Sequence, residues 1–145
     1  MSLDPIRHEY VVGCTPDRAF DTYANRIAEW WDPRYTANPD TFDGVSIEPH
    51  VGGEVVETHR GDQRIPWGNV TVWEPGRQLS YTSTLAQTHE SPSEITVRFT
   101  PDGDRCRVAF EHGGWNEGNK QARSKFQDWP VILARFVALA ERLDR

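Results

Sequence analysis

Residues 65–85, IPWGNVTVWEPGRQLSYTSTL, read as two strands joined by a tight turn. In 65–73 the large side chains fall on odd positions, and a second alternating run follows at 79–85. Between them, Glu74-Pro75-Gly76-Arg77 favours a turn, because proline fixes one φ angle and glycine accepts a positive one. Alternation with a period of two indicates strands with one buried face. This stretch therefore predicts an antiparallel hairpin.

The same pattern continues on both sides of the hairpin. We expect strands at 6–12, 44–49 and 53–60 before it, and at 94–100 and 105–112 after it. The later strands are short, consecutive and linked by turns, which indicates antiparallel pairing. The sequence therefore predicts a seven-stranded antiparallel sheet.

Helical signals lie at the two ends of this run of strands. Thr15-Pro16-Asp17 combines an N-cap, a proline at the first position and an early acid, so it predicts a helix start. A second short helix is expected over 27–31. The C-terminal 26 residues place apolar side chains three or four apart, as one face of a long helix requires. Because Pro130 lies inside that segment, we expect a kink near 126–129 or a helix start there. The order predicts an α+β fold with the long helix packed on the sheet.

Length and composition restrict the classes of protein. A chain of 145 residues is enough for one domain with its own core, so 1–145 is expected to be a single domain. No apolar run is long enough for a membrane helix. The absence of a signal-peptide pattern and the two cysteines favour the cytoplasm. A net charge of −6 argues against binding nucleic acid. We expect a monomer or a weak homodimer.

Several motifs occur in an order that matches a known family. They are TPDRAFD at 15–21, EPHVGGE at 48–54, the hairpin 67–82, EHGGW at 111–115 and WPVILARF at 129–136. On these motifs the chain resembles the activator-of-heat-shock-protein-90-ATPase homology branch of the START-related, birch-pollen-allergen-like superfamily. The resemblance implies a helix-grip fold, in which the sheet wraps around the C-terminal helix. It also implies a cavity, and the pairing of first and last strands that would bring Cys14 near Cys106.

Strand register assigns the candidate site. By alternation Val55, Glu57 and His59 face inward, and so do Trp67, Asn69, Thr71 and Trp73; a slip of one residue would invert each assignment. Mostly apolar walls with a few polar groups are typical of a small-molecule site. The alternative is an ordinary core in which the polar groups pair with one another or with water. The candidate ligand-binding residues are Trp31, Glu57, Trp67, Asn69, Tyr81, Ser83, Phe99, Phe110, His112, Trp115, Phe126 and Trp129.

Catalytic and metal chemistry have weaker signals. Glu57 and His112 are the candidate acid and base, since a carboxylate and an imidazole in one cavity can transfer protons. The alternative is a structural pair, because a buried carboxylate needs a partner to be tolerated. The five histidines are scattered, with no HExxH or CxxC motif, so no metal site is expected. We expect no cofactor.

Three functions remain open. The first is a cytoplasmic protein that binds a small apolar or amphipathic molecule between the sheet and the C-terminal helix. The second is a cyclase, hydrolase or dehalogenase that uses the same cavity. The third is a cochaperone-like interaction module whose partner surface is the outer sheet face. We expect the largest pocket to lie between the sheet and the 118–143 helix, and the loops 32–44 and 86–92 to gate its mouth.

Overall fold

A computed structural model of the chain describes residues 3–36, 38–84 and 91–143. Its seven-stranded sheet has the order β1-β7-β6-β5-β4-β3-β2, and every neighbouring pair is antiparallel. The strands are β1 (Ile6–Val12), β2 (Phe42–Ile47), β3 (Glu54–His59), β4 (Gln63–Glu74), β5 (Gln78–Ser83), β6 (Ser93–Asp102) and β7 (Arg105–Gly113). All seven expected strands are therefore confirmed, with ends that differ from the expected ones by at most two residues.

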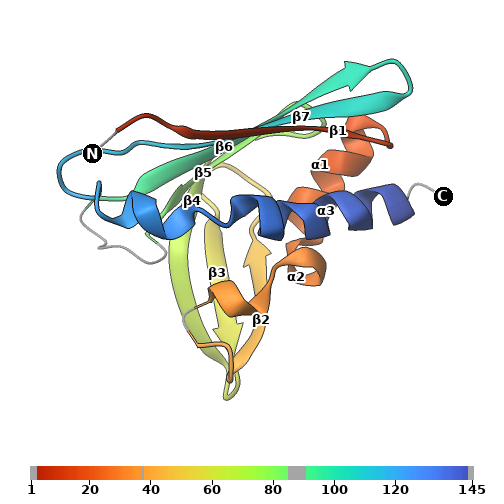
Figure 1. The fold of residues 1–145 in the computed structure, drawn as a ribbon. Helices are drawn as coiled ribbons and strands as arrows, with labels where there is room; N and C mark the ends of the chain where they lie inside the picture. Colours follow the sequence, from red (N-terminus) through yellow and green to blue (C-terminus); the bar gives the residue numbers. More distant parts are fainter. Residues whose placement is uncertain (1–2, 37, 85–90, 144–145) are drawn as a thin grey trace.

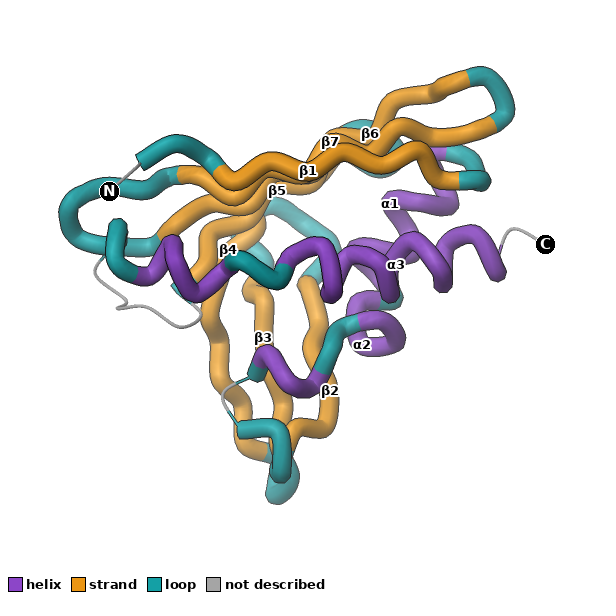
Figure 2. Tube along the Cα trace, viewed as in Figure 1, coloured by secondary structure: helices purple, strands orange, loops and turns teal. Residues whose placement is uncertain are grey.

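Helices cover one face of this sheet. They are α1 (Pro16–Asn25), α2 (Ile27–Trp30), the short 3-10 helices η1 (Pro33–Tyr35) and η2 (Ala122–Phe126), and α3 (Trp129–Leu143). Figure 1 shows α3 crossing the sheet, with α1 and α2 on the same side. The sheet is strongly twisted, so β1 and β7 run in a different direction from β2 and β3 (Figure 2). This is the expected helix-grip α+β fold.

The local signals in the sequence act as predicted. The Thr15 hydroxyl accepts a hydrogen bond from the Arg18 N–H at 3.2 Å, and Pro16 begins α1. Gly76 adopts a φ of 77° in the turn between β4 and β5. The helix start that Pro130 predicted lies at Trp129, after η2.

Two irregularities in β4 reverse the expected orientation of two of its residues. Val55 pairs with Gly68 but Val56 pairs with Pro66, so Trp67 is an extra residue opposite β3. A second register shift, between Val70 and Val72, makes Thr71 extra opposite β5. Each bulge resets the alternation of inward and outward side chains. Trp67 and Val70 are therefore buried, whereas Asn69 and Thr71, both expected to face inward, are exposed.

The first bulge depends on Gly68. A Cβ atom at this position would overlap the carbonyl oxygen of Thr82. The Asn69 N–H donates to the Thr82 hydroxyl at 3.0 Å and holds β4 and β5 together at this point. A side chain at residue 68 would thus push the two strands apart beside Trp67.

We predict that Gly68→Ala lowers the free energy of unfolding by about 1–3 kcal/mol, as expected when an atom is forced into a packed region. Urea unfolding monitored by circular dichroism measures this. Gly44→Ala is the matched control on β2, because a Cβ there lies at an ordinary 3.5 Å from the Thr58 hydroxyl. Equal losses in the two variants would show that the close approach at Gly68 has no energetic weight.

Candidate functional site

The inner face of the sheet gathers most of the predicted site residues. Trp31, Glu57, Trp67, Tyr81, Ser83, Phe99, Phe110, His112, Trp115 and Trp129 are all buried, and Phe126 is half-buried. Asn69 is the exception described above. The predicted inward orientation is thus confirmed for the strands β3, β5, β6 and β7.

A continuous chain of ring contacts runs across this face, which we call the aromatic chain. Trp67 contacts Trp31 with ring centroids 5.9 Å apart, and Trp31 contacts Trp129 at 6.0 Å. Trp129 packs on Phe110 at 4.6 Å. His112 continues the chain and contacts Trp115, Phe126 and Trp129. Trp129 and Phe126 thus pack against His112 from the side of α3.

Phe99 does not belong to the aromatic chain. It packs against Phe20 of α1 at 5.4 Å, and Phe20 also contacts Trp73 at 5.0 Å. These three rings form the core beneath α1 instead of the site near Trp67. Tyr81 links Trp67 to α1. Its ring contacts Trp67, and its hydroxyl group lies within hydrogen-bond distance, 2.7 Å, of the hydroxyl group of Tyr23 on α1.

His112 connects the start of α3 to the sheet. The Trp129 indole N–H donates to His112 Nδ1 at 3.1 Å, while Nε2 lies 2.7 Å from the Ser93 hydroxyl. An indole nitrogen only donates, so Nδ1 accepts and the proton of the neutral ring sits on Nε2. The Ser93 hydroxyl oxygen therefore accepts a hydrogen bond from the His112 Nε2–H. The same hydroxyl group donates its hydrogen to the Ser83 carbonyl at 3.3 Å. Both ring nitrogens are therefore engaged.

Burial makes His112 a weak base. Removal from water lowers the pKa of this imidazole from 6.5 to about 3, because the charged form loses its hydration. A base of this strength is largely unprotonated at neutral pH and has little driving force to accept a proton. His112 therefore acts in the fold as a neutral hydrogen-bonding group.

The expected pair of Glu57 and His112 does not form. Both ring nitrogens of His112 already have partners, Trp129 and Ser93, and three strands lie between β3 and β7 in the sheet order. Glu57 instead bonds His59, with Oε2 and Nε2 2.6 Å apart, and His59 Nδ1 lies 2.8 Å from the Thr41 hydroxyl. Both Glu57 and His59 are buried. We call Thr41, His59 and Glu57 the polar triad.

Several residues of the site escaped the sequence analysis. Alternation places His59 on the same inward face as Glu57, but a spacing of two residues does not by itself predict that the two side chains bond. Ser93 lies one residue before the expected start of its strand. Thr41 lies in a loop, where pattern gives no register.

Two buried indole groups differ from the others. Trp31 and Trp67 are 2% and 3% exposed, yet neither Nε1–H has an acceptor among the described residues. Such a donor costs about 1–3 kcal/mol when it is left without a partner in the interior. By contrast, Trp30 donates to the Thr22 carbonyl at 3.0 Å.

The segments over this face are held by specific contacts. Asp32 caps η1 and forms an ion pair with Arg34 at 2.6 Å, and this hydrogen bonding lowers the pKa of the Asp32 carboxyl. The Tyr35 hydroxyl donates to Asp128 at 2.8 Å, which raises the pKa of Tyr35. Arg135 of α3 donates to the Trp30 carbonyl at 2.8 Å. The proposed gating segment 86–92 lies largely outside the described residues, as does residue 37 of the loop 32–44.

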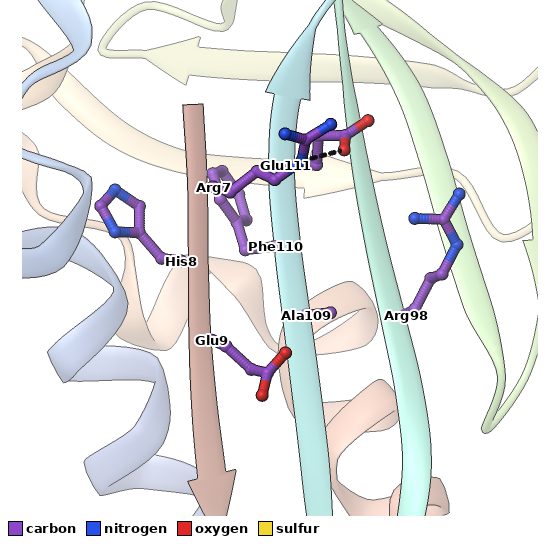
Figure 3. Close-up of a pocket in the computed structure, with 7 residues that line it drawn as sticks. All are labelled: Arg7, His8, Glu9, Arg98, Ala109, Phe110 and Glu111. Atoms are coloured by element: carbon purple, nitrogen blue, oxygen red, sulfur yellow. Dashed lines mark hydrogen bonds and ion pairs between the residues drawn. The ribbon is translucent and has the colours of Figure 1, made fainter. Parts of the chain in front are cut away.

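A shallow hollow of about 260 Å³ occupies the opposite, outer face of the sheet. Figure 3 shows it between β1, β7 and β6, with Arg7 and Glu111 joined by an ion pair and with Glu9 and Arg98 at its sides. Its rim is charged and exposed. The expected pocket between the sheet and α3 stays a prediction.

The structure also bears on the expectations for the cysteines, for metal binding and for membrane helices. Cys14 and Cys106 are buried thiols, and Cys106 pairs with Val12 where β1 meets β7 antiparallel, as the resemblance implied. Among the described residues no three potential metal ligands gather. The described helices include none with the length and apolar character of a membrane span.

A curled antiparallel sheet gripping a C-terminal helix over an aromatic interior defines the helix-grip class. The family model "Activator of Hsp90 ATPase homolog 1-like protein" matches residues 14–141, and the chain belongs to this family. Its fold is a ligand-binding fold. Among curated proteins no match was found.

Solved structures share this fold. Protein MLL2253 from Mesorhizobium loti superposes with a TM-score of 0.70 at 20% identity, covering 97% of this chain and 99% of that one. The Aha1 dimer from Colwellia psychrerythraea gives 0.69 at 17% identity, covering 94% and 96%. An anthrahydroquino-γ-pyrone synthase, Txn09, complexed with a compound designated SUM, gives 0.63 at 25% identity, covering 95% and 99%.

We predict that His112 makes stability depend on pH. Its pKa is lower in the fold than in the unfolded chain, so the unfolded state takes up the extra proton. The contribution of His112 to the free energy of unfolding is then fully present above pH 6.5 and is lost as the pH drops toward about 3. The slope from this group is at most about 1.4 kcal/mol per pH unit.

Urea unfolding at pH 7, 6 and 5 measures this slope. His112→Gln should flatten it, while the control His50→Gln, at an exposed position, should leave it unchanged. The same slope in wild type and His112→Gln would contradict the assignment.

Proposed function

We propose that the protein binds a small apolar or amphipathic molecule on the inner face of the sheet, beneath α3. The observation that carries the proposal is the aromatic chain from Trp67 through Trp31 to Trp129 and His112. Aromatic walls supply large apolar contact area, and a few fixed polar groups orient a ligand. The segments over these rings include η1 and η2, which are short 3-10 turns. Short irregular segments open at lower cost than long packed helices.

The ligand-binding fold of the family supports this proposal. The proposal also includes the location and the oligomeric state of the protein. We infer a cytoplasmic protein that is a monomer or a weak homodimer; the Colwellia structure is described as a dimer. A binding protein of this kind needs no cofactor. The outer hollow is the alternative location, because an interaction module would use that face.

Two variants on opposite faces of the sheet test the location. Ser83→Phe adds a ring to the buried inner face, and Ala109→Phe adds the same ring to the outer hollow. Protein purified from its own host is analysed by native mass spectrometry for a bound compound, and the compound is then titrated into each variant. We expect Ser83→Phe to abolish binding and Ala109→Phe to retain it.

The comparison is made where both variants keep the near-ultraviolet circular dichroism of the wild type. Loss of binding in Ala109→Phe alone would move the function to the outer face. Absence of any compound and of any binding to the inner face would contradict the proposal.

A second candidate function is catalysis in the same interior. The polar triad favours it, since a carboxyl group, an imidazole and a hydroxyl group are joined by consecutive hydrogen bonds. This arrangement can move a proton from a hydroxyl group to an imidazole. The similarity to a synthase at 25% identity is consistent with a reaction on a cyclic ligand.

We predict for this candidate that Glu57→Gln lowers turnover of the co-purified compound by about 100-fold or more, the range of general acid–base catalysis. Binding of the compound should remain. Mass spectrometry of the products measures turnover, and Glu54→Gln, a half-buried neighbour on β3, is the control. Equal turnover in the two variants would exclude a role for the triad in catalysis.

A further inference from the structure

Trp31 and Trp67 have three properties in common, and the third, a buried indole N–H without an acceptor, is found in no other tryptophan of the described residues. Their side chains are 2% and 3% exposed, and their rings lie in contact with centroids 5.9 Å apart. Neither indole N–H has an acceptor among residues 3–36, 38–84 and 91–143. Buried donors in folded proteins are satisfied in the great majority of cases. Two unsatisfied donors on neighbouring rings therefore require an explanation.

The rest of the same cluster shows that this is a local feature. Trp30 donates to the Thr22 carbonyl, Trp115 to the His112 carbonyl at 2.9 Å, and Trp129 to His112 Nδ1. The fold thus supplies an acceptor for each of these three indole groups. What distinguishes Trp31 and Trp67 is their place: one follows α2 directly, and the other is the bulged residue of β4.

The chemistry of the pair selects a ligand class. An indole nitrogen donates and does not accept, so its partner must carry an acceptor, and a carbonyl oxygen has two lone pairs for two donors. The neighbouring rings Tyr81 and Trp129 favour a flat aromatic body beside that oxygen.

The charges of the interior favour a neutral ligand. Among the described residues the buried carboxyl groups are Asp32 and Glu57, and no lysine or arginine is buried. Glu57 lies on β3, the strand next to Trp67. An anion would therefore be placed in the interior without a counter-ion, at a high desolvation cost. A neutral carbonyl satisfies the donors without this cost.

We propose that the indole N–H groups of Trp31 and Trp67 form a donor pair that binds the carbonyl oxygen of a neutral, planar aromatic ketone or quinone. This inference rests on the proposed ligand-binding function and names the class of ligand. The pair selects for an acceptor at one end of an otherwise apolar molecule.

A matched pair of probes tests the donor pair. 9-Fluorenone and fluorene share one flat tricyclic skeleton, and only fluorenone has a carbonyl group. Isothermal titration calorimetry measures the dissociation constants of both for wild type, for Trp31→Phe/Trp67→Phe, and for the control Trp115→Phe. The ratio of the two constants within each protein cancels changes in packing that affect both probes alike.

We expect the preference for fluorenone over fluorene to fall by about tenfold in the double variant, as the loss of two hydrogen bonds predicts. The control Trp115→Phe should keep the wild-type preference. An unchanged preference in the double variant would overturn the donor pair while leaving the binding function standing. Failure of both probes to bind wild type would instead count against the proposed function.

A second measurement does not depend on the stability of a variant. In wild-type protein labelled with ¹⁵N on tryptophan, fluorenone should shift the indole N–H resonances of Trp31 and Trp67 downfield, and fluorene should not. The Trp30 and Trp115 resonances, whose donors are already bonded, serve as internal references. Equal shifts with both probes would overturn the proposal.

Discussion

The hydrogen bond from the Trp129 indole to His112 determines how helix and sheet meet. It ties the first residue of α3 to the last strand and places the Trp129 ring against Phe110. Because the indole can only donate, it selects one tautomer of the imidazole, and that tautomer engages Ser93 on β6. A proton added to Nδ1 would remove the acceptor, and burial opposes that proton as well. The tautomer of His112 and the junction between the start of α3 and β7 therefore depend on this contact, while burial keeps the histidine neutral.

The sequence predicts the architecture because its signals are local. Alternation defines the strands, Thr15 and Pro16 begin α1, and Gly76 fits the positive φ angle of its turn. Pro130 predicts the helix start because its ring interferes with the preceding turn. Most of the interior follows from the same alternation, so residues such as Phe110 and His112 are placed without any knowledge of their neighbours.

The polar contacts of the site could not be predicted in this way. Alternation shows which side a residue faces, but it does not show which strand lies opposite or how far away it is. Glu57 and His112 share a face but have different partners: His112 bonds Ser93 and Trp129, whereas Glu57 bonds His59, two residues away. Asn69 was misplaced because the bulges of β4 insert extra residues that leave no mark in a period of two. The error at Asn69 falls two residues from Trp67, where the regular pairing of β4 with β3 is interrupted.

The bond between Tyr35 and Asp128 joins η1 to the residue that precedes α3. Tyr35 is packed against the core, so any movement of η1 away from the sheet must break this bond and withdraw the ring. The bond therefore affects the rate at which η1 can move away from the sheet, as well as the stability of its position on the sheet. For a ligand bound beneath η1, as proposed, this bond would slow exchange with solvent, because η1 moves away only after the phenol–carboxylate bond has broken.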